Sequence, residues 1–436
     1  MKTGYRISSA LALAGVLALS GGDAAAQKKA AAPAPARAKA DPAVAETAPI
    51  VYAGATIHTG TGEVITDATV VVAQGKIQAI GKNAAAPANA QTVSARGMII
   101  TPGLVDALTS IGLVEVDLEE STHDDHQSGG DVLRAGFRAA DGYNPASVVV
   151  GVTRAEGLTS VGVIPTGGLI AGQSAWADLD GATAAEAIAA SSLALHVHLG
   201  AGDGGHANAL LRVREALDDA RFFQKNRAAY ERNQTRRFAP SRLDLEALSG
   251  ALDGKLPVVF HVDRAADILS ALGVAREYKL RPVIAGGAEA WKVARELSAA
   301  KVPVIVYPLQ GVSSFDAIGA RDDNAARLAA AGVMVGISTG DTHNARKLRQ
   351  VAGNAVRAGL SHDAALAAIT RVPAEALGLG ARYGTLAPGK IANLVVWSGD
   401  PLELSTRVVD VVIRGKRVSL RNRQTALFEK YRTLAR

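Results

Sequence analysis

Apolar and polar positions alternate in two different ways along the middle of the chain. Short apolar runs rich in Val, Ile and Ala are mostly separated by segments whose apolar side chains recur every three or four positions, such as 265–278 and 289–300. The short runs are typical of buried strands, and the longer period is typical of amphipathic helices. Eight such runs predict strands at 98–105, 160–164, 175–179, 193–199, 256–260, 282–285, 302–306 and 333–337.

Strands that alternate with helices predict a parallel sheet, because a helix is the usual crossover between parallel strands. Eight units within about 250 residues favour an α/β fold in which this sheet closes into a (β/α)8 barrel of the TIM type. The barrel is predicted to span residues 99–385. Active sites of such barrels lie at the carboxyl ends of the strands, so candidate chemistry is sought there.

A different strand pattern marks the two ends of the chain. β-branched runs separated by glycine-containing turns begin near residue 50, and the same pattern of short runs and turns recurs after residue 390. Short runs with frequent turns are typical of antiparallel β structure. We therefore predict one small β-sandwich domain, built from residues 50–98 and 386–420, with the barrel inserted between its two parts.

The first residues have the pattern of an export signal. Lys2 and Arg6 precede a short apolar stretch, Ile7–Leu19, and three alanines ending at Ala26 form a small-residue cleavage motif. This predicts a signal peptide over residues 1–26 that directs the protein through the general secretion pathway to the periplasm or the exterior. The Ala/Pro/Lys-rich segment over 27–49 cannot bury apolar surface and is predicted to be a disordered linker.

Charge and cysteine content exclude several functions. The formal net charge is +6, and the chain from Arg407 to its end holds nine Lys or Arg against two Asp or Glu. The excess therefore lies at the C-terminal end, where 421–436 is predicted to be a basic tail, and no basic face with interleaved aromatics predicts nucleic-acid binding. The absence of Cys excludes disulfides, thiolate chemistry and a lipid-modified cysteine as membrane anchor.

The first predicted barrel strand ends in a motif. Residues 100–110 read Ile-Thr-Pro-Gly-Leu-Val-Asp-Ala-Leu-Thr-Ser, which resembles the P-G-[LF]-[IV]-D-x-H-x-H pattern of the amidohydrolase superfamily. The opening strands around 75–81 and the segment 373–390, which ends Gly-Thr-Leu-Ala-Pro-Gly-Lys, resemble the same family. Together these segments cover essentially the whole chain after the linker, and they are most similar to imidazolonepropionase-like members.

The resemblance implies a metal-dependent hydrolase acting on a carbon–nitrogen bond, non-peptide or dipeptide-like, of a small molecule. Family members hold a divalent metal, zinc above all, with two first-strand histidines, a histidine after strand five, often one after strand six, and an Asp after strand eight that is also the general base. The metal turns bound water into a hydroxide nucleophile near neutral pH. Members often form homodimers, so the resemblance also admits a homodimer.

Several positions depart from this pattern. The two first-strand histidines correspond to Leu108 and Ser110, and the sixth-strand histidine corresponds to Gly286. Leu has no donor atom, and a neutral Ser hydroxyl is a poor metal ligand. His261 keeps the fifth-strand position, whereas Asp341 stands one residue after the eighth-strand position. The metal site implied by the resemblance is therefore degenerate.

Other side chains offer replacements. His196 and His198 share one face of the predicted fourth strand, and with His261 and Asp341 they would form another ligand set, in which Asp341 would also be the base. The segment Thr122–His126, which reads Thr-His-Asp-Asp-His, follows the first strand. It is interpreted as a solvated acidic loop facing the substrate, or as a second group of ligands reaching inward.

Three functions stay open on these residues, each with a small-molecule substrate or ligand as partner. The first is a periplasmic carbon–nitrogen hydrolase with an atypical metal site, in which His261 and Asp341 are catalytic. The second is an inactive barrel without metal that serves as a binding or structural protein, because losing imidazoles weakens metal affinity by orders of magnitude. The third is metal-free acid–base chemistry by His261 with Asp263 or Asp341.

Overall fold

The structure is a computed structural model, and its described part comprises residues 48–126, 132–200, 205–309, 311–312 and 314–433. The predicted signal peptide and almost all of the predicted linker lie outside these residues. Within them the chain forms three β-sheets with helices around them. None of the described helices is both long enough and apolar enough to cross a lipid bilayer.

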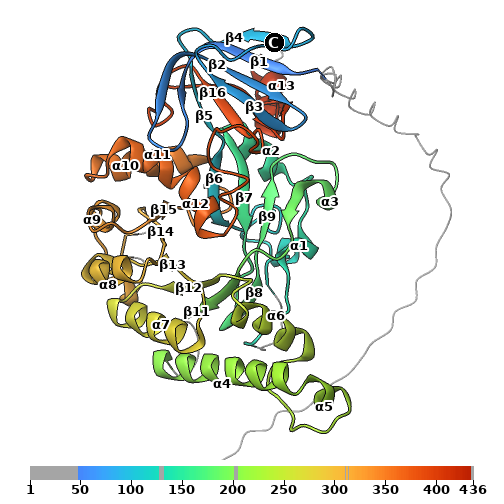
Figure 1. Cartoon of the computed structure of the whole chain (residues 1–436), viewed down its shortest axis with the longest axis vertical. Coiled ribbons are helices and arrows are strands. Elements are labelled where there is room, and N and C mark those ends of the chain that lie inside the picture. Colours follow the sequence, from blue (N-terminus) through green and yellow to red (C-terminus); the bar gives the residue numbers. More distant parts are fainter. Residues whose placement is uncertain (1–47, 127–131, 201–204, 310, 313, 434–436) are drawn as a thin grey trace, which may run out of the picture. The chain divides into compact units, whose positions relative to one another are not determined.

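One sheet joins strands from both ends of the chain, as the blue and red strands of Figure 1 show. Its strands hydrogen-bond in the order β18-β17-β16-β5-β1-β2-β3, with β4 beside β1. The two ends of the chain meet where β16 runs antiparallel to β5. The strands are β1 (Ile50–His58), β2 (Val64–Ala73), β3 (Lys76–Gly81), β4 (Gln91–Ser94), β5 (Ile99–Pro102), β16 (Leu394–Trp397), β17 (Val408–Ile413) and β18 (Lys416–Arg417).

This sheet curls around an apolar core of its own. Val70 and Val72 of β2 are buried and pack with Ile100 and Leu394 from the strands that meet in the middle of the sheet. The start of β3 returns towards the segment before β16, because the Ile77 N–H donates to the Lys390 carbonyl at 2.9 Å. The structure thus shows one curled sheet, and its division into the two layers of a sandwich stays a prediction, as do the domain boundaries.

Two further sheets contain the predicted barrel strands. One has the order β10-β9-β7-β6 and the other β15-β14-β13-β12-β11-β8. β6 is parallel to β7, and each of the strands from β11 to β15 is parallel to the next. The strands are β6 (Leu104–Thr109), β7 (Leu158–Val163), β8 (Ile170–Gln173), β9 (Ala175–Asp178), β10 (Ile188–Ala190), β11 (Leu195–His198), β12 (Val258–Val262), β13 (Pro282–Gly286), β14 (Val304–Val306) and β15 (Val335–Ile337).

Backbone hydrogen bonds do not close these two sheets into one ring among the described residues. Antiparallel neighbours interrupt the parallel order, since β9 runs antiparallel to β7 and β8 runs antiparallel to β11. The predicted third barrel strand, 175–179, therefore forms as β9 but is not a parallel barrel strand. The mixed α/β class is confirmed, and closure of the barrel stays a prediction.

The strand predicted over 98–105 is in fact two strands. β5 ends at Pro102 and β6 begins at Leu104, so the chain passes from the end sheet to the next sheet at Gly103. A Cβ atom at Gly103 would collide with the side chain of Thr159 on β7. Glycine thus permits the close approach that this crossing requires, which explains the Pro-Gly pair at the start of the motif.

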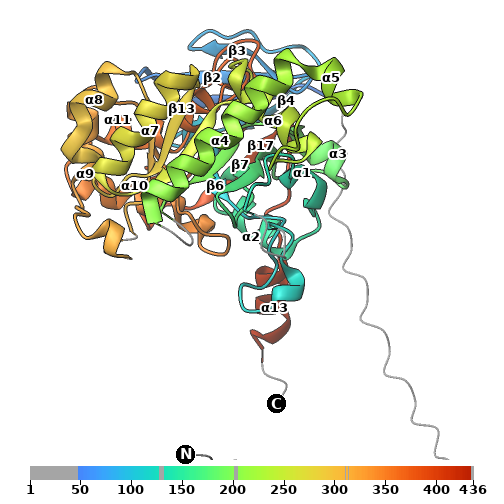
Figure 2. The same ribbon diagram turned by 90° about the horizontal axis from the view of Figure 1, so that it is seen from below.

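Helices accompany the strands, and Figure 2 shows α4, α6 and α7 from below. The predicted basic tail contains one helix, α13, which contacts α2. The α-helices are α1 (Ala139–Gly142), α2 (Val148–Arg154), α3 (Ala184–Ala187), α4 (Gly205–Lys225), α5 (Arg227–Glu231), α6 (Arg242–Leu252), α7 (Ala265–Tyr278), α8 (Ala294–Ala299), α9 (Asn324–Ala330), α10 (Leu348–Arg357), α11 (His362–Ala368), α12 (Arg371–Ala376) and α13 (Arg423–Tyr431). Four short 3-10 turns are η1 (Glu120–Thr122), η2 (Ala290–Val293), η3 (Phe315–Ala317) and η4 (Ala345–Lys347).

Candidate functional site

His261 of β12 contacts two histidines of β11, and we call the three the strand histidines: His196, His198 and His261. Nδ1 of His196 lies 2.9 Å from Nε2 of His261, within hydrogen-bond distance. The His198 ring stacks on the His261 ring, with 4.1 Å between centroids and 10° between planes. His196 and His198 are two residues apart on one strand, so both reach the same neighbour, as their spacing predicts.

Burial keeps the strand histidines neutral. It lowers the pKa of His196 to about 3 and that of His198 to about 4. Burial also lowers the pKa of His261 well below its ordinary value, and the two neighbouring rings add to this effect. The Nε2 atoms of His196 and His198 are buried without a hydrogen-bond partner in the described part of the chain. An imidazole that does not take up a proton is in the form that binds metals.

The carboxylate of Asp341 is hydrogen-bonded within the turn that follows β15. Its two carboxylate oxygens accept hydrogen bonds from the backbone N–H and the side-chain amide of Asn344, at 2.8 and 2.9 Å. It also lines a cavity of about 250 Å³ together with Thr339 and Lys347. Over the residues that the structure describes, Asp341 and the strand histidines do not converge as a metal-binding group. Their roles as metal ligands, and that of Asp341 as a base, stay predictions.

Asp106, the acid of the first-strand motif, is wholly buried and links the edges of two sheets. Its carboxylate accepts from the Thr339 N–H at 3.0 Å, from the Thr339 hydroxyl at 2.6 Å and from the Ser338 hydroxyl. Burial raises the pKa of Asp106 to about 6, although these donors act in the opposite direction. The Asp106 side chain therefore joins β6 to the segment after β15. These two strands belong to different sheets and are not paired by backbone hydrogen bonds.

A cavity of about 170 Å³ lies at the carboxyl ends of β12, β13 and β14. Asp263, Gly286 and Tyr307 line it on the strand side. Burial raises the pKa of Asp263, the backbone N–H of Ala288 lowers it, and the charge of Asp316 raises it further. Burial likewise raises the pKa of Tyr307. Two groups that tend to keep their protons thus face one small cavity.

The loop after β6 brings three further ligand-type side chains together, and we call them the loop cluster: His123, Asp125 and His126. Nδ1 of His126 lies 2.9 Å from Oδ1 of Asp125, and Nδ1 of His123 lies 3.7 Å from the same oxygen. Among the described residues, this is the one group of three or more His, Asp or Glu side chains whose ligand atoms all lie within 4.8 Å of one another. The predicted Thr122–His126 segment therefore contains converging side chains.

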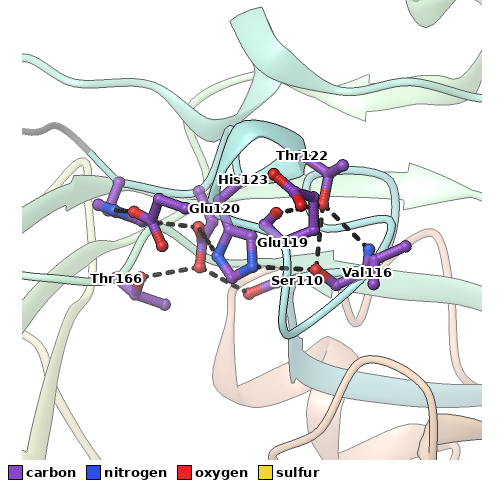
Figure 3. A network of polar contacts seen from close by, with 9 residues as sticks. Ser110, Val116, Glu119, Glu120, Thr122, His123 and Thr166 are labelled. Carbon is purple, nitrogen blue, oxygen red and sulfur yellow. Dashed lines mark hydrogen bonds and ion pairs between the residues drawn. The ribbon is translucent and has the colours of Figure 1, made fainter.

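Each member of the loop cluster also has a partner outside it, and Figure 3 shows this network. The hydrogen bond to Asp125 raises the pKa of His126, with Glu120 adding to the effect and burial opposing it. Oδ2 of Asp125 accepts hydrogen bonds from the hydroxyls of Thr166 (2.8 Å) and Ser110 (3.5 Å). Nε2 of His126 lies 2.9 Å from the carboxylate of Glu120. Nε2 of His123 lies 3.3 Å from the carbonyl oxygen of Val116.

Comparisons with known proteins show which proteins the chain is similar to. A sequence profile described as "Amidohydrolase family" matches residues 241–418. A solved amidohydrolase from Thermotoga maritima MSB8 is 28% identical, covers 85% of this chain and 100% of its own, and superimposes with a TM-score of 0.78. In sequence and in fold, the chain is similar to the amidohydrolase family.

Two curated proteins match shorter segments of the chain. Imidazolonepropionase of Chromobacterium violaceum is 41% identical over 87 residues, which is 19% of this chain and 21% of that protein. Amidohydrolase tasK of Hapsidospora irregularis is 38% identical over 79 residues, or 18% and 8% of the two chains. The chain thus spans about a fifth or less of the length of these two relatives.

Amidohydrolases are generally metal-dependent, but the residues at the family's metal positions do not fit a metal ion in this structure. Leu108 is 1% exposed and lies in an apolar core cluster, and Ser110 offers only a neutral hydroxyl. Gly286 has a φ of +86°, and a Cβ added to it would lie 2.8 Å from an oxygen of Asp263. Of the corresponding histidines only His261 remains, and its Nε2 faces His196.

Two of the groups at this candidate site could not be found from the sequence. The role of Asp106 in linking two sheets was not predicted, although the residue belongs to the quoted motif. Tyr307 belongs to no recognised motif. Its signal in the sequence is a polar aromatic residue directly after the apolar run of β14, where a strand end is predicted. Both residues are recognisable only once the ends of separate strands lie together.

Proposed function

We propose that this protein is an exported hydrolase that cleaves a carbon–nitrogen bond, non-peptide or dipeptide-like, of a small molecule, and that its metal site is atypical. The observation that supports this most is the alignment of the entire Thermotoga amidohydrolase with 85% of this chain. The shared length includes the strand ends, where proteins of this fold hold their chemistry.

The groups around the 170 Å³ cavity are suited to proton transfer. Hydrolysis of a carbon–nitrogen bond needs a base for the attacking water and an acid for the departing nitrogen. Asp263, whose pKa is raised by burial, gives up its proton nearer neutral pH than an exposed Asp does. Tyr307 keeps its phenolic proton and can donate it to a substrate oxygen, while Asp263, once ionised, can accept the proton of the attacking water. We assign no step to a metal at the family positions, because those residues do not fit one.

The test is an assay of the mature protein, residues 27–436, against dipeptides, N-acylated amino acids and cyclic amides, with release of the amine measured. We expect turnover on one of these classes. Asp263→Asn should lower kcat about 100-fold, the lower end of what a positioned acid or base contributes. Asp322→Asn is the matched control, because Asp322 lines the same cavity but is exposed and has no assigned role. Absence of turnover on all three classes would contradict the proposal.

A second candidate function, binding without hydrolysis, is favoured by one specific observation. Leu108 fills a first-strand metal position with a buried apolar side chain, so metal-activated water cannot form there. Such a protein would remain folded in excess chelator, and a small molecule would raise its melting temperature without being converted. Product analysis after long incubation separates the two candidates, since a hydrolase consumes the ligand and a binding protein returns it unchanged.

Export and self-association complete the proposal. The signal pattern over residues 1–26 supports transfer to the periplasm, and the family resemblance supports a homodimer. Fractionation of expressing cells followed by N-terminal sequencing should give a periplasmic chain that begins at Gln27, and light scattering should give twice the mass of the mature chain. A full-length chain retained in the cytoplasm would contradict the first part, and a monomeric mass would contradict the second.

A further inference from the structure

The loop cluster combines the donor types of a metal site at a place where the family resemblance assigns none. We propose that His123, Asp125 and His126 bind a divalent transition metal ion, with zinc the best chemical match. Imidazole nitrogen together with carboxylate oxygen is a donor set that zinc favours. The proposal rests on side-chain geometry and does not require the protein to be a hydrolase.

The ligand atoms of the three residues lie within 4.8 Å of one another. Nδ1 of His123 and Nδ1 of His126 lie 3.7 and 2.9 Å from Oδ1 of Asp125. Ligands that each stand about 2.0–2.1 Å from a tetrahedral zinc ion lie roughly 3.3 Å from one another. The two observed distances lie on either side of this value, so small side-chain shifts would let the three residues hold the ion and leave the fourth position for water.

The outer hydrogen bonds orient both imidazoles in the way that metal sites require. A histidine ligand almost always donates its other ring N–H to a carboxylate or a backbone carbonyl, which fixes the tautomer. Nε2 of His126 lies 2.9 Å from the Glu120 carboxylate, and Nε2 of His123 lies 3.3 Å from the Val116 carbonyl oxygen. With the protons on Nε2, both Nδ1 lone pairs point towards Asp125.

The carboxylate between the imidazoles is also held in place. Asp125 is only 6% exposed. Its Oδ2 accepts from the Thr166 hydroxyl at 2.8 Å, and its backbone oxygen accepts from the Thr166 N–H at the same distance. Oδ1 remains for the two histidines. A ligand fixed by its own hydrogen bonds loses little freedom when the metal arrives.

The position of the loop cluster connects it to the strand ends. Ser110, which stands where the family has its second first-strand histidine, lies 3.5 Å from Oδ2 of Asp125 through its hydroxyl. The new ligands would therefore hold a metal beside the altered first-strand positions rather than at them. This arrangement explains how the loop could supply donors that Leu108 and Ser110 cannot.

The competing interpretation is an ion pair in which a protonated His126 lies between Asp125 and Glu120. That pair accounts for His126 but gives no reason for His123 to turn its Nδ1 towards the same oxygen. His343 shows such a pair without a second imidazole, since it contacts the Asp117 carboxylate at 3.0 Å and the Glu115 carbonyl oxygen at 3.0 Å. It therefore provides a matched control.

The test measures metal binding by the mature protein, using zinc titration by calorimetry and the absorption spectrum of the cobalt-substituted form. We expect about one ion per chain and a cobalt spectrum of nitrogen and oxygen ligands. His123→Gln and His126→Gln should each weaken binding at least tenfold, whereas His343→Gln should leave it unchanged. Circular dichroism checks that each variant is folded, and the histidine variants decide the question if Asp125→Asn does not fold.

Two outcomes would overturn the proposal. One is the absence of stoichiometric zinc binding by the wild-type protein. The other is binding that persists in His123→Gln and His126→Gln, including the case in which it is lost in His261→Ala and the metal therefore sits at the strand histidines. Because the readout is binding, a protein that binds zinc at the loop and hydrolyses nothing would contradict the proposed function but not this site.

Discussion

The strand histidines and the loop cluster place the same side chain in opposite surroundings. His196 and His198 contact another imidazole, that of His261, and within the described residues neither has a hydrogen bond to a carboxylate. His126 lies between the carboxylates of Asp125 and Glu120. Burial lowers the pKa in the first group, and hydrogen-bonded carboxylates raise it in the second.

This contrast shows that the spacing of histidines along a chain does not decide their chemistry. His-Val-His on β11 resembles a metal motif in the sequence, yet its third neighbour is another histidine and not a carboxylate. The loop cluster lacks the spacing of a strand motif, yet it has the mixed donors and the outer partners of a metal site. Four experiments sharpen the comparison, from the largest expected effect to the smallest.

The largest effect is expected at the most buried imidazole. His196→Ala should lower the free energy of unfolding by about 3 kcal/mol, because it leaves a cavity and removes the partner of His261 Nε2. Urea denaturation of the mature protein measures this. His343→Ala, at a partly exposed ion pair, should cost less than about 1 kcal/mol. Equal losses at the two positions would show that burial is not what distinguishes the strand histidines.

Zinc should stabilise the protein through the loop cluster alone. At a free concentration 100 times its Kd, a ligand that binds only the folded state adds about 2.7 kcal/mol. We expect this gain in the wild type and in His196→Gln, and its loss in His126→Gln. Unfolding curves with and without zinc measure it. A gain that vanishes in His196→Gln would reverse the assignment of the two clusters.

Acid should act on the strand histidines. The pKa of His196 is about 3 in the folded protein and about 6.5 in an unfolded chain. Between these values the unfolded state binds a proton that the folded state excludes, so stability falls as the pH falls below about 6.5. The loss for one histidine is roughly 2 kcal/mol at pH 5. His196→Gln should flatten this part of the stability curve, as measured by urea unfolding at several pH values; an unchanged slope would contradict burial as the cause.

The smallest effect concerns His126 without metal. In chelator, His126→Gln should cost less than about 1 kcal/mol, because the side chain is partly exposed. The folded pKa of His126 is raised, so its contribution is complete below about pH 6.5 and is lost as the pH rises through the folded value. The difference between variant and wild type should thus be larger at pH 6 than at pH 9, and a difference that grows with pH would show that the carboxylates do not stabilise the protonated ring.

Local pattern was sufficient to predict several features. The alternation of a strand places His196 and His198 on one face, and both rings contact His261. The apolar runs located the parallel strands β11 to β15 to within a few residues. The first-strand motif pointed to the family to which the comparisons also find the chain similar. Each of these depends on neighbours in the sequence.

Features that depend on distant contacts could not be predicted. Convergence of the loop cluster requires Thr166 from beyond β7 and Ser110 from the end of β6. The link made by Asp106 requires Ser338 and Thr339, more than 200 residues later. Antiparallel pairing of β9 with β7 looks the same in sequence as parallel pairing, because both bury an apolar run. These arrangements follow from packing between elements and not from the pattern of any single element.

The pairing of β5 with β16 has a consequence for how the chain is made. These neighbouring strands are separated by almost 300 residues, so the end sheet has a high contact order and cannot be completed until the last part of the chain has been synthesised. Contacts between distant segments form slowly, and an unpaired strand edge promotes aggregation in the meantime. A chain truncated before Leu394 would lack β16 and would leave one edge of β5 unpaired. We therefore expect the truncated chain to be less soluble than the intact chain.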